Sequence, residues 1–283
     1  MKISSFNIQT FLIDGGTMFG VVPKALWNRQ YPADENNLIP LDLRSLVIET
    51  NNRVVLIDTG FGDKQSEKFF RHFYLFGGEG LIEGLANLGY KPSDITDVIH
   101  THLHYDHCGG GIGVDKSGNY YPVFPNAKYH ISQAQWDSAL NPNIREADSF
   151  MMDNILPIKD LGLLNLIKKE GELMPGIELR FFNGHTKGQM IPIIELPNGK
   201  KLVYTADLFP STAHIHLAWN ASYDVEPLVS IEEKETFLNE AIGKNYYLYY
   251  QHDHFTECGT LSQTPKGIRA GNKLALNEIL KGV

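Results

Sequence analysis

The chain has 283 residues, 42% hydrophobic and 20% charged, which is the composition of a folded globular protein and excludes disorder over most of its length. Twenty-five basic and thirty-three acidic residues give a net charge of −8, which disfavours general binding to nucleic acids or anionic membranes. Two cysteines are too few for a disulfide scaffold. The sequence shows no signal peptide and no apolar run of about eighteen residues, so we expect a cytoplasmic protein without a membrane partner.

Hydrophobic patterning in the first half of the chain is mostly of the strand kind. Apolar runs predict strands over 4–13, 43–49, 53–57 and 97–100. Asn51-Asn52 separates the second of these runs from the third, so we expect a β-hairpin there. Apolar residues at helical spacing predict a helix over 64–88. The fourth strand leads directly into a polar, glycine-rich segment.

The second half of the chain repeats this order of elements. The pattern predicts strands over 178–183, 190–196, 201–205 and 246–251, with a helix over 230–242. Ser230 is expected to cap that helix, and Glu233 to close a capping box. Two similar halves predict an α/β protein with two sheets packed together and helices outside them. Because no linker-like stretch divides the halves, we predict one domain over 1–283.

A dense group of polar residues follows the fourth predicted strand. It reads Thr-His-Leu-His-Tyr-Asp-His over 101–107 and continues into Cys-Gly-Gly-Gly. His102 and His104 are two positions apart in extended chain, so their side chains are expected on one side. Asp106 and His107 are adjacent and are expected to diverge toward a second centre. Imidazoles and carboxylates are ligands that a divalent ion such as zinc accepts, whereas the alternative is a histidine-rich surface loop.

Further candidate ligands lie downstream, each just after a predicted strand. They are His185, Asp207 and His252, with His254 as the alternative to His252. One histidine or aspartate at a strand end usually serves as a cap or a buried hydrogen-bonding group. Several segments with the same placement instead predict a polynuclear metal site.

With these motifs the chain resembles the metallo-β-lactamase superfamily. The resemblance rests on Ile57-Asp58-Thr59-Gly60, H-x-H-x-D-H over 102–107, Gly184-His185-Thr186, Ala206-Asp207 and His252-Asp253. It implies an αββα sandwich, in which two mixed β-sheets carry helices on their outer faces and the metals lie at one edge of the sheets.

The resemblance also implies a set of ligands for two divalent ions. The first ion would be held by His102, His104 and His185, the second by Asp106, His107 and His252, and both by a bridging Asp207. Asp58 would orient the ligands without binding metal. Zinc is the expected ion, with Mn²⁺, Fe²⁺ and Co²⁺ as alternatives.

Within the superfamily, the chain resembles the N-acyl homoserine lactone lactonases and the methyl-parathion-hydrolase-like enzymes. The segments 15–20, 34–37 and 207–210 carry this likeness. Pro210 departs from it, because small lactonases of this group have a tyrosine there. The resemblance implies a hydrolase in which a metal-bridging hydroxide attacks a lactone or ester carbonyl. Asp106 would pass a proton to the leaving alkoxide, and Asp207 would hold both metals.

Three functional hypotheses follow. The first is a lactonase or esterase acting on a small molecule, with quorum quenching as its biological meaning. The second is an aryl-ester or organophosphate (phosphotriester) hydrolase, because the metal chemistry alone does not distinguish these substrates. The third is a non-catalytic metal-binding or redox protein. We expect no nucleic-acid partner, and a homodimer is left open.

Apolar and aromatic residues near these motifs are candidates for the wall of a substrate pocket. They are Met18, Phe19, Trp27, Phe209, His214, His216, Trp219 and Tyr223. His214 and His216 alternate as in a strand, which would turn both toward the site. Core packing is the alternative role for the aromatic residues. Cys108 is expected to be a small buried residue and not a thiolate ligand.

Overall fold

The computed structural model describes residues 1–282 of the chain. These residues divide into two units. Unit 1 consists of Met1–Thr10 and Asp42–Lys169, and unit 2 consists of Phe11–Leu41 and the chain from Glu170 onward. The single domain over 1–283 stays a prediction.

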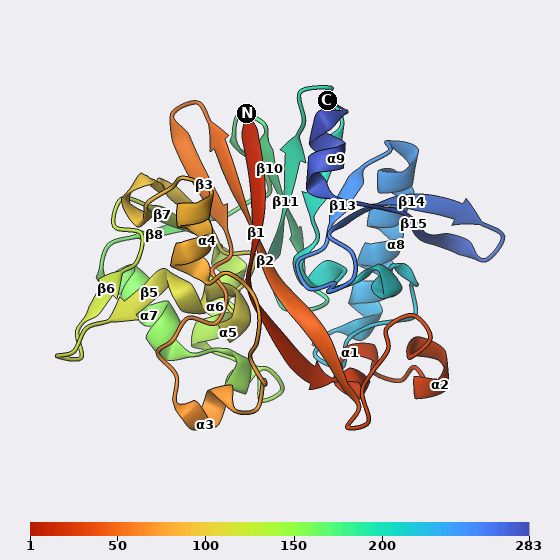
Figure 1. The fold of residues 1–283 in the computed structure, drawn as a ribbon, viewed down its shortest axis with the longest axis horizontal. Coiled ribbons are helices and arrows are strands. Elements are labelled where there is room, and N and C mark those ends of the chain that lie inside the picture. Colours follow the sequence, from red (N-terminus) through yellow and green to blue (C-terminus); the bar gives the residue numbers. More distant parts are fainter. Residues whose placement is uncertain (283) are drawn as a thin grey trace. The chain divides into compact units, whose positions relative to one another are not determined.

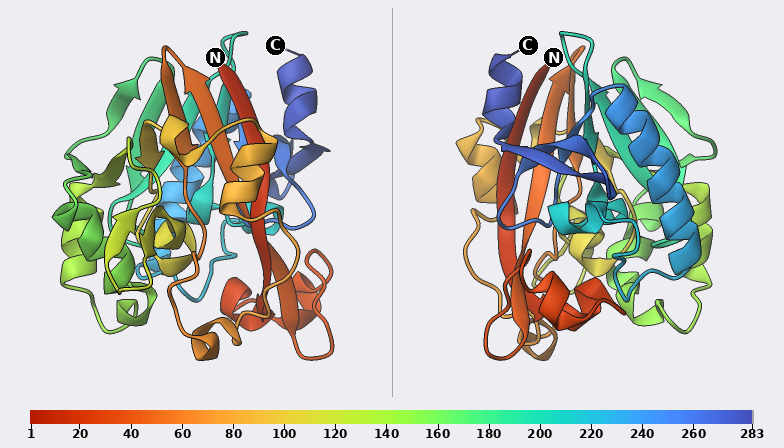
Figure 2. Two further views of the ribbon diagram at one scale, coloured as in Figure 1. Left: turned by 60° about the vertical axis from the view of Figure 1, so that its left-hand side comes forward. Right: turned by 90° about the vertical axis from the view of Figure 1, so that its right-hand side faces the viewer.

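The main sheet of unit 1 has the strand order β1-β2-β3-β4-β7-β8. The strands are β1 (Lys2–Asp14), β2 (Leu38–Thr50), β3 (Arg53–Ile57), β4 (Asp97–Ile99), β7 (Lys128–Ser132) and β8 (Leu164–Ile167). Strands β2 and β3 pair antiparallel, whereas β3, β4, β7 and β8 pair parallel, so the sheet is mixed. Figure 2 shows the long neighbouring strands β1 and β2, which continue into unit 2. A separate hairpin is formed by β5 (Ile112–Val114) and β6 (Tyr120–Pro122).

Local chemistry explains the centre of this sheet. The turn between β2 and β3 lies at Asn51 and Asn52, with φ of 45° and 62°, a left-handed conformation that asparagine tolerates better than most residues. The predicted hairpin is therefore confirmed, with Thr50 opposite Arg53. The short strand β4 is fully buried between two parallel neighbours, as expected for the interior of a parallel sheet.

The helices of unit 1 are short. They are α3 (Glu67–Phe70), α4 (Leu81–Asn87), α5 (Tyr105–Cys108), α6 (Gln133–Leu140) and α7 (Met152–Asp160), with 3₁₀ turns η1 (Pro92–Asp94), η2 (Gly109–Gly111) and η3 (Ala147–Ser149). The predicted single helix over 64–88 is wrong, because α3 and α4 are separate. Gly77, Gly78 and Gly80 interrupt the pattern with φ of 54°, 76° and 79°. A side chain on Gly78 would lie 2.5 Å from the carbonyl oxygen of Ile8, so the chain here must approach β1 closely.

The sheet of unit 2 has the strand order β15-β14-β13-β12-β11-β10-β9. The strands are β9 (Gly171–Met174), β10 (Ile177–Phe182), β11 (Gln189–Glu195), β12 (Lys201–Tyr204), β13 (Tyr247–Tyr249), β14 (Cys258–Thr264) and β15 (Gly267–Leu274). Strands β12 and β13 pair parallel and the other neighbours antiparallel. This sheet is mixed too, so the predicted α/β class with two mixed sheets is confirmed.

Helices of very different length accompany this second sheet. They are α1 (Gly15–Phe19), α2 (Lys24–Trp27), α8 (Pro227–Gly243) and α9 (Leu276–Lys281), with 3₁₀ turns η4 (Ala206–Leu208) and η5 (Thr212–Ile215). Helix α8 packs against β14 and β15 (Figure 1). It begins at Pro227, a favoured first helical position, so Ser230 lies inside the helix and the predicted cap is wrong. His214 lies in η5, so the strand-like alternation predicted for His214 and His216 is also wrong. No helix within residues 1–282 is long and apolar enough to cross a membrane.

Candidate metal centre

The histidine-rich segment of unit 1 crowds three buried imidazoles together. It follows β4, and its second half forms the short helix α5. The ring of His102 lies 4.5 Å from that of His104 and 3.8 Å from that of His107, measured between centroids. Asp106 is half-buried in the first turn of α5, with Oδ2 3.6 Å from Nε2 of His107. Buried imidazoles this close to one another and to a carboxylate form a donor set that suits a divalent cation.

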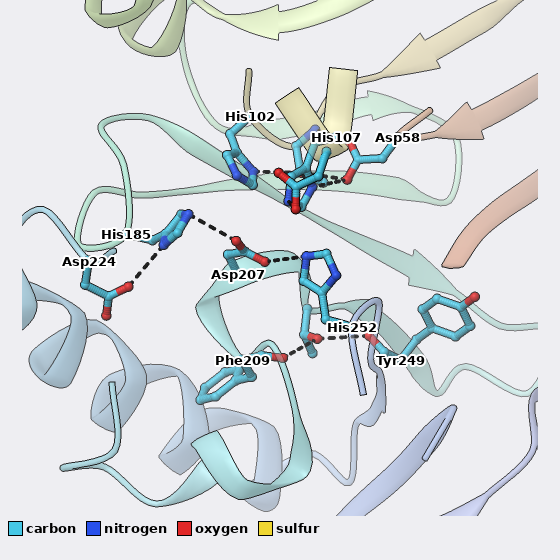
Figure 3. A network of polar contacts seen from close by, with 12 residues as sticks. Asp58, His102, His107, His185, Asp207, Phe209, Asp224, Tyr249 and His252 are labelled. Carbon is cyan, nitrogen blue, oxygen red and sulfur yellow. Dashed lines mark hydrogen bonds and ion pairs between the residues drawn. The ribbon is translucent and has the colours of Figure 1, made fainter. Parts of the chain in front are cut away.

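Asp58 orients this segment, as the resemblance implies. It is fully buried just after β3 and adopts a left-handed backbone conformation with φ of 57°. Its carboxylate accepts hydrogen bonds from the backbone N–H and the hydroxyl of Thr101, both at 2.8 Å. It also accepts from Nδ1 of His107 at 2.9 Å (Figure 3). Nδ1 of His107 is thereby engaged, which leaves Nε2 as the nitrogen for a metal.

The glycines after the histidines allow a close approach of two backbone segments. A side chain on Gly109 would lie 1.9 Å from the carbonyl oxygen of Phe61, and one on Gly110 would lie 2.3 Å from that of Thr59. The backbone N–H of Thr59 also donates to the carbonyl of His107 at 2.7 Å. The close approach therefore depends on these glycines, and Cys108 beside them is buried as expected.

Three predicted ligands of unit 2 meet at one carboxylate. His185 follows β10, Asp207 lies in η4 just after β12, and His252 follows β13. One carboxylate oxygen of Asp207 lies 3.1 Å from Nε2 of His185, and the other lies 3.0 Å from Nε2 of His252. Figure 3 shows both contacts. Sequence positions far apart thus converge because each stands at the end of a strand of the same sheet.

His185 has a second carboxylate partner, Asp224, which no sequence motif indicates. Nδ1 of His185 donates to Asp224 at 3.0 Å, and the backbone N–H of Val225 donates to the carbonyl of His185 at 3.1 Å. Burial alone would lower the pKa of His185, but the charges and hydrogen bonds of Asp207 and Asp224 raise it to about 10. Two carboxylates therefore stabilise positive charge at this imidazole, which is the electrostatic environment of a cation site.

Helix α8 holds the chain that carries His185. The carboxylate of Glu233 accepts from the backbone N–H of Asn183 at 2.8 Å and of Gly184 at 3.0 Å. A side chain on Gly184 would lie 2.2 Å from the hydroxyl of Ser230, so this loop packs directly on the helix. Ser230 and Glu233 thus support the ligand loop instead of forming the predicted capping box.

The structure separates His252 from its alternative, His254. His252 lies 3.0 Å from Asp207, as described above, and its ring contacts Phe11 with a centroid distance of 6.3 Å. The backbone N–H of His254 donates to the hydroxyl of Tyr31 at 2.8 Å, and its ring packs against Phe255.

Each unit presents candidate metal ligands of its own among the residues that the structure describes. Unit 1 contributes His102, His104, Asp106 and His107, and unit 2 contributes His185, Asp207 and His252. Imidazole nitrogens and carboxylate oxygens fit zinc and neighbouring divalent metals, so the donor chemistry agrees with a dinuclear site.

Most of the predicted pocket residues of unit 2 are buried, and the rings of Phe19, Trp27, His214 and Trp219 form one cluster. The ring of Phe19 stacks between Trp27 at 5.0 Å and His214 at 4.9 Å, and contacts Trp219 edge-on at 5.9 Å. Burial lowers the pKa of His214 to about 4. Its Nε2 donates to the carbonyl of Met18 at 2.7 Å, so this imidazole is neutral with the proton on Nε2. The roles of these residues in binding substrate stay predictions.

Three pocket candidates lie apart from this description: His216 is half-buried, Tyr223 is exposed, and Phe209 is fully buried and packs differently. Its ring lies 6.0 Å from that of Phe237 on α8, and Lys234 lies over its face at 5.8 Å. Figure 3 shows it below Asp207, where its carbonyl accepts from the hydroxyl of Thr205 at 2.9 Å.

An aromatic cluster beside the ligands of unit 1 was missed as a site feature. Tyr105, between His104 and Asp106 in sequence, stacks on Phe61 at 5.7 Å and contacts Phe69 at 5.2 Å and Phe73 at 5.4 Å. From the sequence, Phe69 and Phe73 were assigned to one long helix, so their contacts with Tyr105 were not predicted. The sequence signal that could have indicated this cluster is Tyr105, an aromatic residue inside the metal-binding motif.

Comparisons with known proteins agree with this geometry. The family model of the metallo-beta-lactamase superfamily matches residues 41–254. A probable metal-dependent hydrolase from Staphylococcus aureus has a TM-score of 0.85 and 34% identity, covering 97% of this chain and 98% of that one. The dizinc quorum-quenching lactonase AidC, in complex with the product N-hexanoyl-L-homoserine, has a TM-score of 0.75 and covers 97% of this chain and 95% of its own. At 22% identity, this second likeness shows the fold alone.

Among curated proteins, an N-acyl homoserine lactonase of Bacillus cereus is 25% identical over 181 residues. That match covers 60% of this chain and 65% of the lactonase, which is less than two thirds of the relative's length. Since the family model spans most of the chain and the fold agrees with it, the chain belongs to the metallo-β-lactamase superfamily.

Proposed function

We propose that this protein uses two divalent metal ions to hydrolyse a lactone or a related ester, with an N-acyl homoserine lactone as the first substrate to test. The observation that carries the proposal is the position of Asp207. Its two carboxylate oxygens face His185 and His252, at 3.1 and 3.0 Å. In the proposed ligand set these two histidines hold different ions, so one carboxylate would serve both, as a bridging ligand must.

We assign the ligands as the resemblance to the superfamily implies. One ion would be held by His102, His104 and His185, the other by Asp106, His107 and His252, and both by Asp207. Zinc is the first choice, since imidazole and carboxylate donors suit it and the structural relative AidC is a dizinc enzyme. When bound, two such ions supply an activated water near neutral pH and polarise the carbonyl that is attacked.

The protein's own residues prepare these ligands and move the proton. Asp58 and Asp224 engage the Nδ1 atoms of His107 and His185, so each imidazole keeps Nε2 for the metal. Asp106 is the half-buried carboxylate of the segment, and we assign it the transfer of a proton to the leaving alkoxide. These roles make Asp58 and Asp224 positioning residues and Asp106 a catalytic one.

The aromatic cluster of unit 1 offers an apolar surface to the substrate's acyl or aryl group. Tyr105, Phe69 and Phe73 are all half-buried, so part of each ring remains available for contact. Tyr105 lies in the ligand segment, which places this surface beside Asp106 and His104. Each methylene buried there would contribute about 0.8 kcal/mol at most. The proposal therefore favours substrates with an apolar acyl chain over short ones.

The substrate class is tested by a panel of lactones, aryl esters and phosphotriesters, assayed with and without a metal chelator. We expect hydrolysis of an N-acyl homoserine lactone to rise with acyl-chain length and to disappear in the chelator. A phosphotriester cleaved far more efficiently than any lactone would replace the lactonase proposal with the organophosphate alternative. Hydrolysis that continues in the chelator, with the protein shown to be metal-free, would refute the metal-dependent mechanism altogether.

A further inference from the structure

We propose that unit 2 carries a second binding site, for an organic anion with a flat or apolar body. The site is a surface hollow of about 360 Å³, lined by Arg29, Lys266 and Arg269 together with Leu26, His216 and Trp219. It lies among the end of α2, the segment after η5 and the turn of the β14–β15 hairpin. None of these residues is a proposed metal ligand, and the surface proposed for the substrate's acyl group lies in unit 1, so the inference goes beyond the proposed reaction.

The charge of the hollow is opposite to that of the protein. The whole chain carries a net charge of −8, yet the segments 24–31, 211–222 and 264–277 contain no aspartate or glutamate. Within the described residues, no ion pair engages Arg29, Lys266 or Arg269. Three cations therefore converge on one hollow without a counter-ion from the segments that form it. An anion from solution is the chemistry that would neutralise them.

The lining beneath the cations is aromatic. Trp219 is buried, and its ring stacks on that of His216 at 5.1 Å. Lys234 holds the backbone of this wall, because its Nζ donates to the carbonyl of Trp219 at 2.9 Å. Such a rigid, flat surface favours an aromatic or apolar ligand body over a small inorganic ion.

His216 contributes a polar side chain to the lining of the hollow. Its Nδ1 is buried and has no hydrogen-bond partner among the described residues. Burial lowers the pKa of His216, and the positive charges of Arg269 and Lys234 lower it further, which agrees with a positive potential at this point. The arginines supply donors suited to a carboxylate, and the volume lies within the range of small-molecule sites. The ligand class is therefore an aromatic or acyl carboxylate.

The experiment is titration calorimetry of the metal-replete protein with 2-naphthoate. We expect one naphthoate per chain, weaker binding at 300 mM than at 20 mM salt, and no detectable binding of the neutral analogue 2-naphthalenemethanol. The double variant Arg29→Gln/Arg269→Gln should bind naphthoate at least about tenfold more weakly. Lys266→Gln should weaken binding to a smaller extent. The matched control is Lys273→Gln, an exposed cation on β15 outside the hollow, which should stay within about twofold.

Chelator-treated protein distinguishes this site from the metal centre. Naphthoate that binds in the hollow keeps its affinity after metal removal, whereas naphthoate that binds to the metals loses it. Loss of binding on metal removal, equal binding by the double variant, equal binding of the neutral analogue, or no binding of naphthoate would each overturn the proposal. Arg29 is exposed and Arg269 half-buried, so unchanged thermal unfolding of the double variant is the expected check on its fold.

Discussion

The contact between Glu233 and the loop before His185 makes a specific prediction for the variant Glu233→Gln. The wild-type carboxylate accepts the backbone N–H groups of Asn183 and Gly184 with its two oxygens. Glutamine offers one accepting oxygen and one donating amide group. One of the two backbone N–H groups would then face a donor instead of an acceptor. The loop should lose one charge-assisted hydrogen bond and become less well fixed on α8.

The size of this effect can be worked from the structure. A hydrogen bond to a charged group contributes about 1.5–3 kcal/mol, and the half-buried position of Glu233 favours the lower end. A loss of about 1.4 kcal/mol corresponds to a factor of about ten in an equilibrium constant. Since the lost bond positions His185, we expect the affinity for zinc to fall by about tenfold. Substitutions behind metal ligands typically cost about 10–100-fold, which agrees with this value.

The assay is zinc binding to the metal-free protein in competition with a chromophoric chelator, together with thermal unfolding. Glu232→Gln is the matched control, because Glu232 is the neighbouring residue on the same helix and is exposed. The control should bind zinc as the wild type does. If Glu233→Gln and Glu232→Gln both kept wild-type zinc affinity, the argument that α8 positions His185 would be refuted.

Further predictions concern the ligands and the cysteines. Asp207→Ala removes the carboxylate that faces both His185 and His252, so this variant should lose metal and most of kcat and not only show a higher KM. Full metal content with wild-type turnover would contradict this prediction. Asp224→Ala should lower the affinity for zinc by about 10–100-fold. Asp224→Asn should lower it by less, since the amide oxygen can still accept from His185. If both variants bound zinc as tightly as the wild type in a chelator competition, the orienting role of Asp224 would be contradicted. Both cysteines are buried, and burial raises the pKa of Cys108, so a thiol reagent should modify the two side chains no faster than the protein unfolds.

Parts of the fold set by neighbouring residues could be predicted from the sequence, and parts set by tertiary contacts could not. The hairpin at Asn51-Asn52 needs only local turn chemistry, and it was found. The prediction of one helix over 64–88 was wrong because the apolar residues of α3 and α4 both have helical spacing, although a glycine-rich segment separates the two helices. Gly78 stands there because β1 lies too close for a side chain, a contact with no local signature.

The candidate site follows the same division. The candidate ligands could be named because each follows a strand and belongs to a compact motif. Asp224 could not, since its partner His185 lies 39 residues away and no spacing rule connects them. Glu233 was predicted to have a different role from the one that the structure shows. It matched a capping-box pattern, whereas the structure uses its carboxylate for backbone groups 50 residues earlier in the chain.

The metal content of the purified protein tests the central claim most directly. Elemental analysis after metal-replete purification should find two divalent ions per chain, because the two carboxylate oxygens of Asp207 face His185 and His252, which are proposed to hold different ions. One ion per chain, or none, would contradict the dinuclear mechanism.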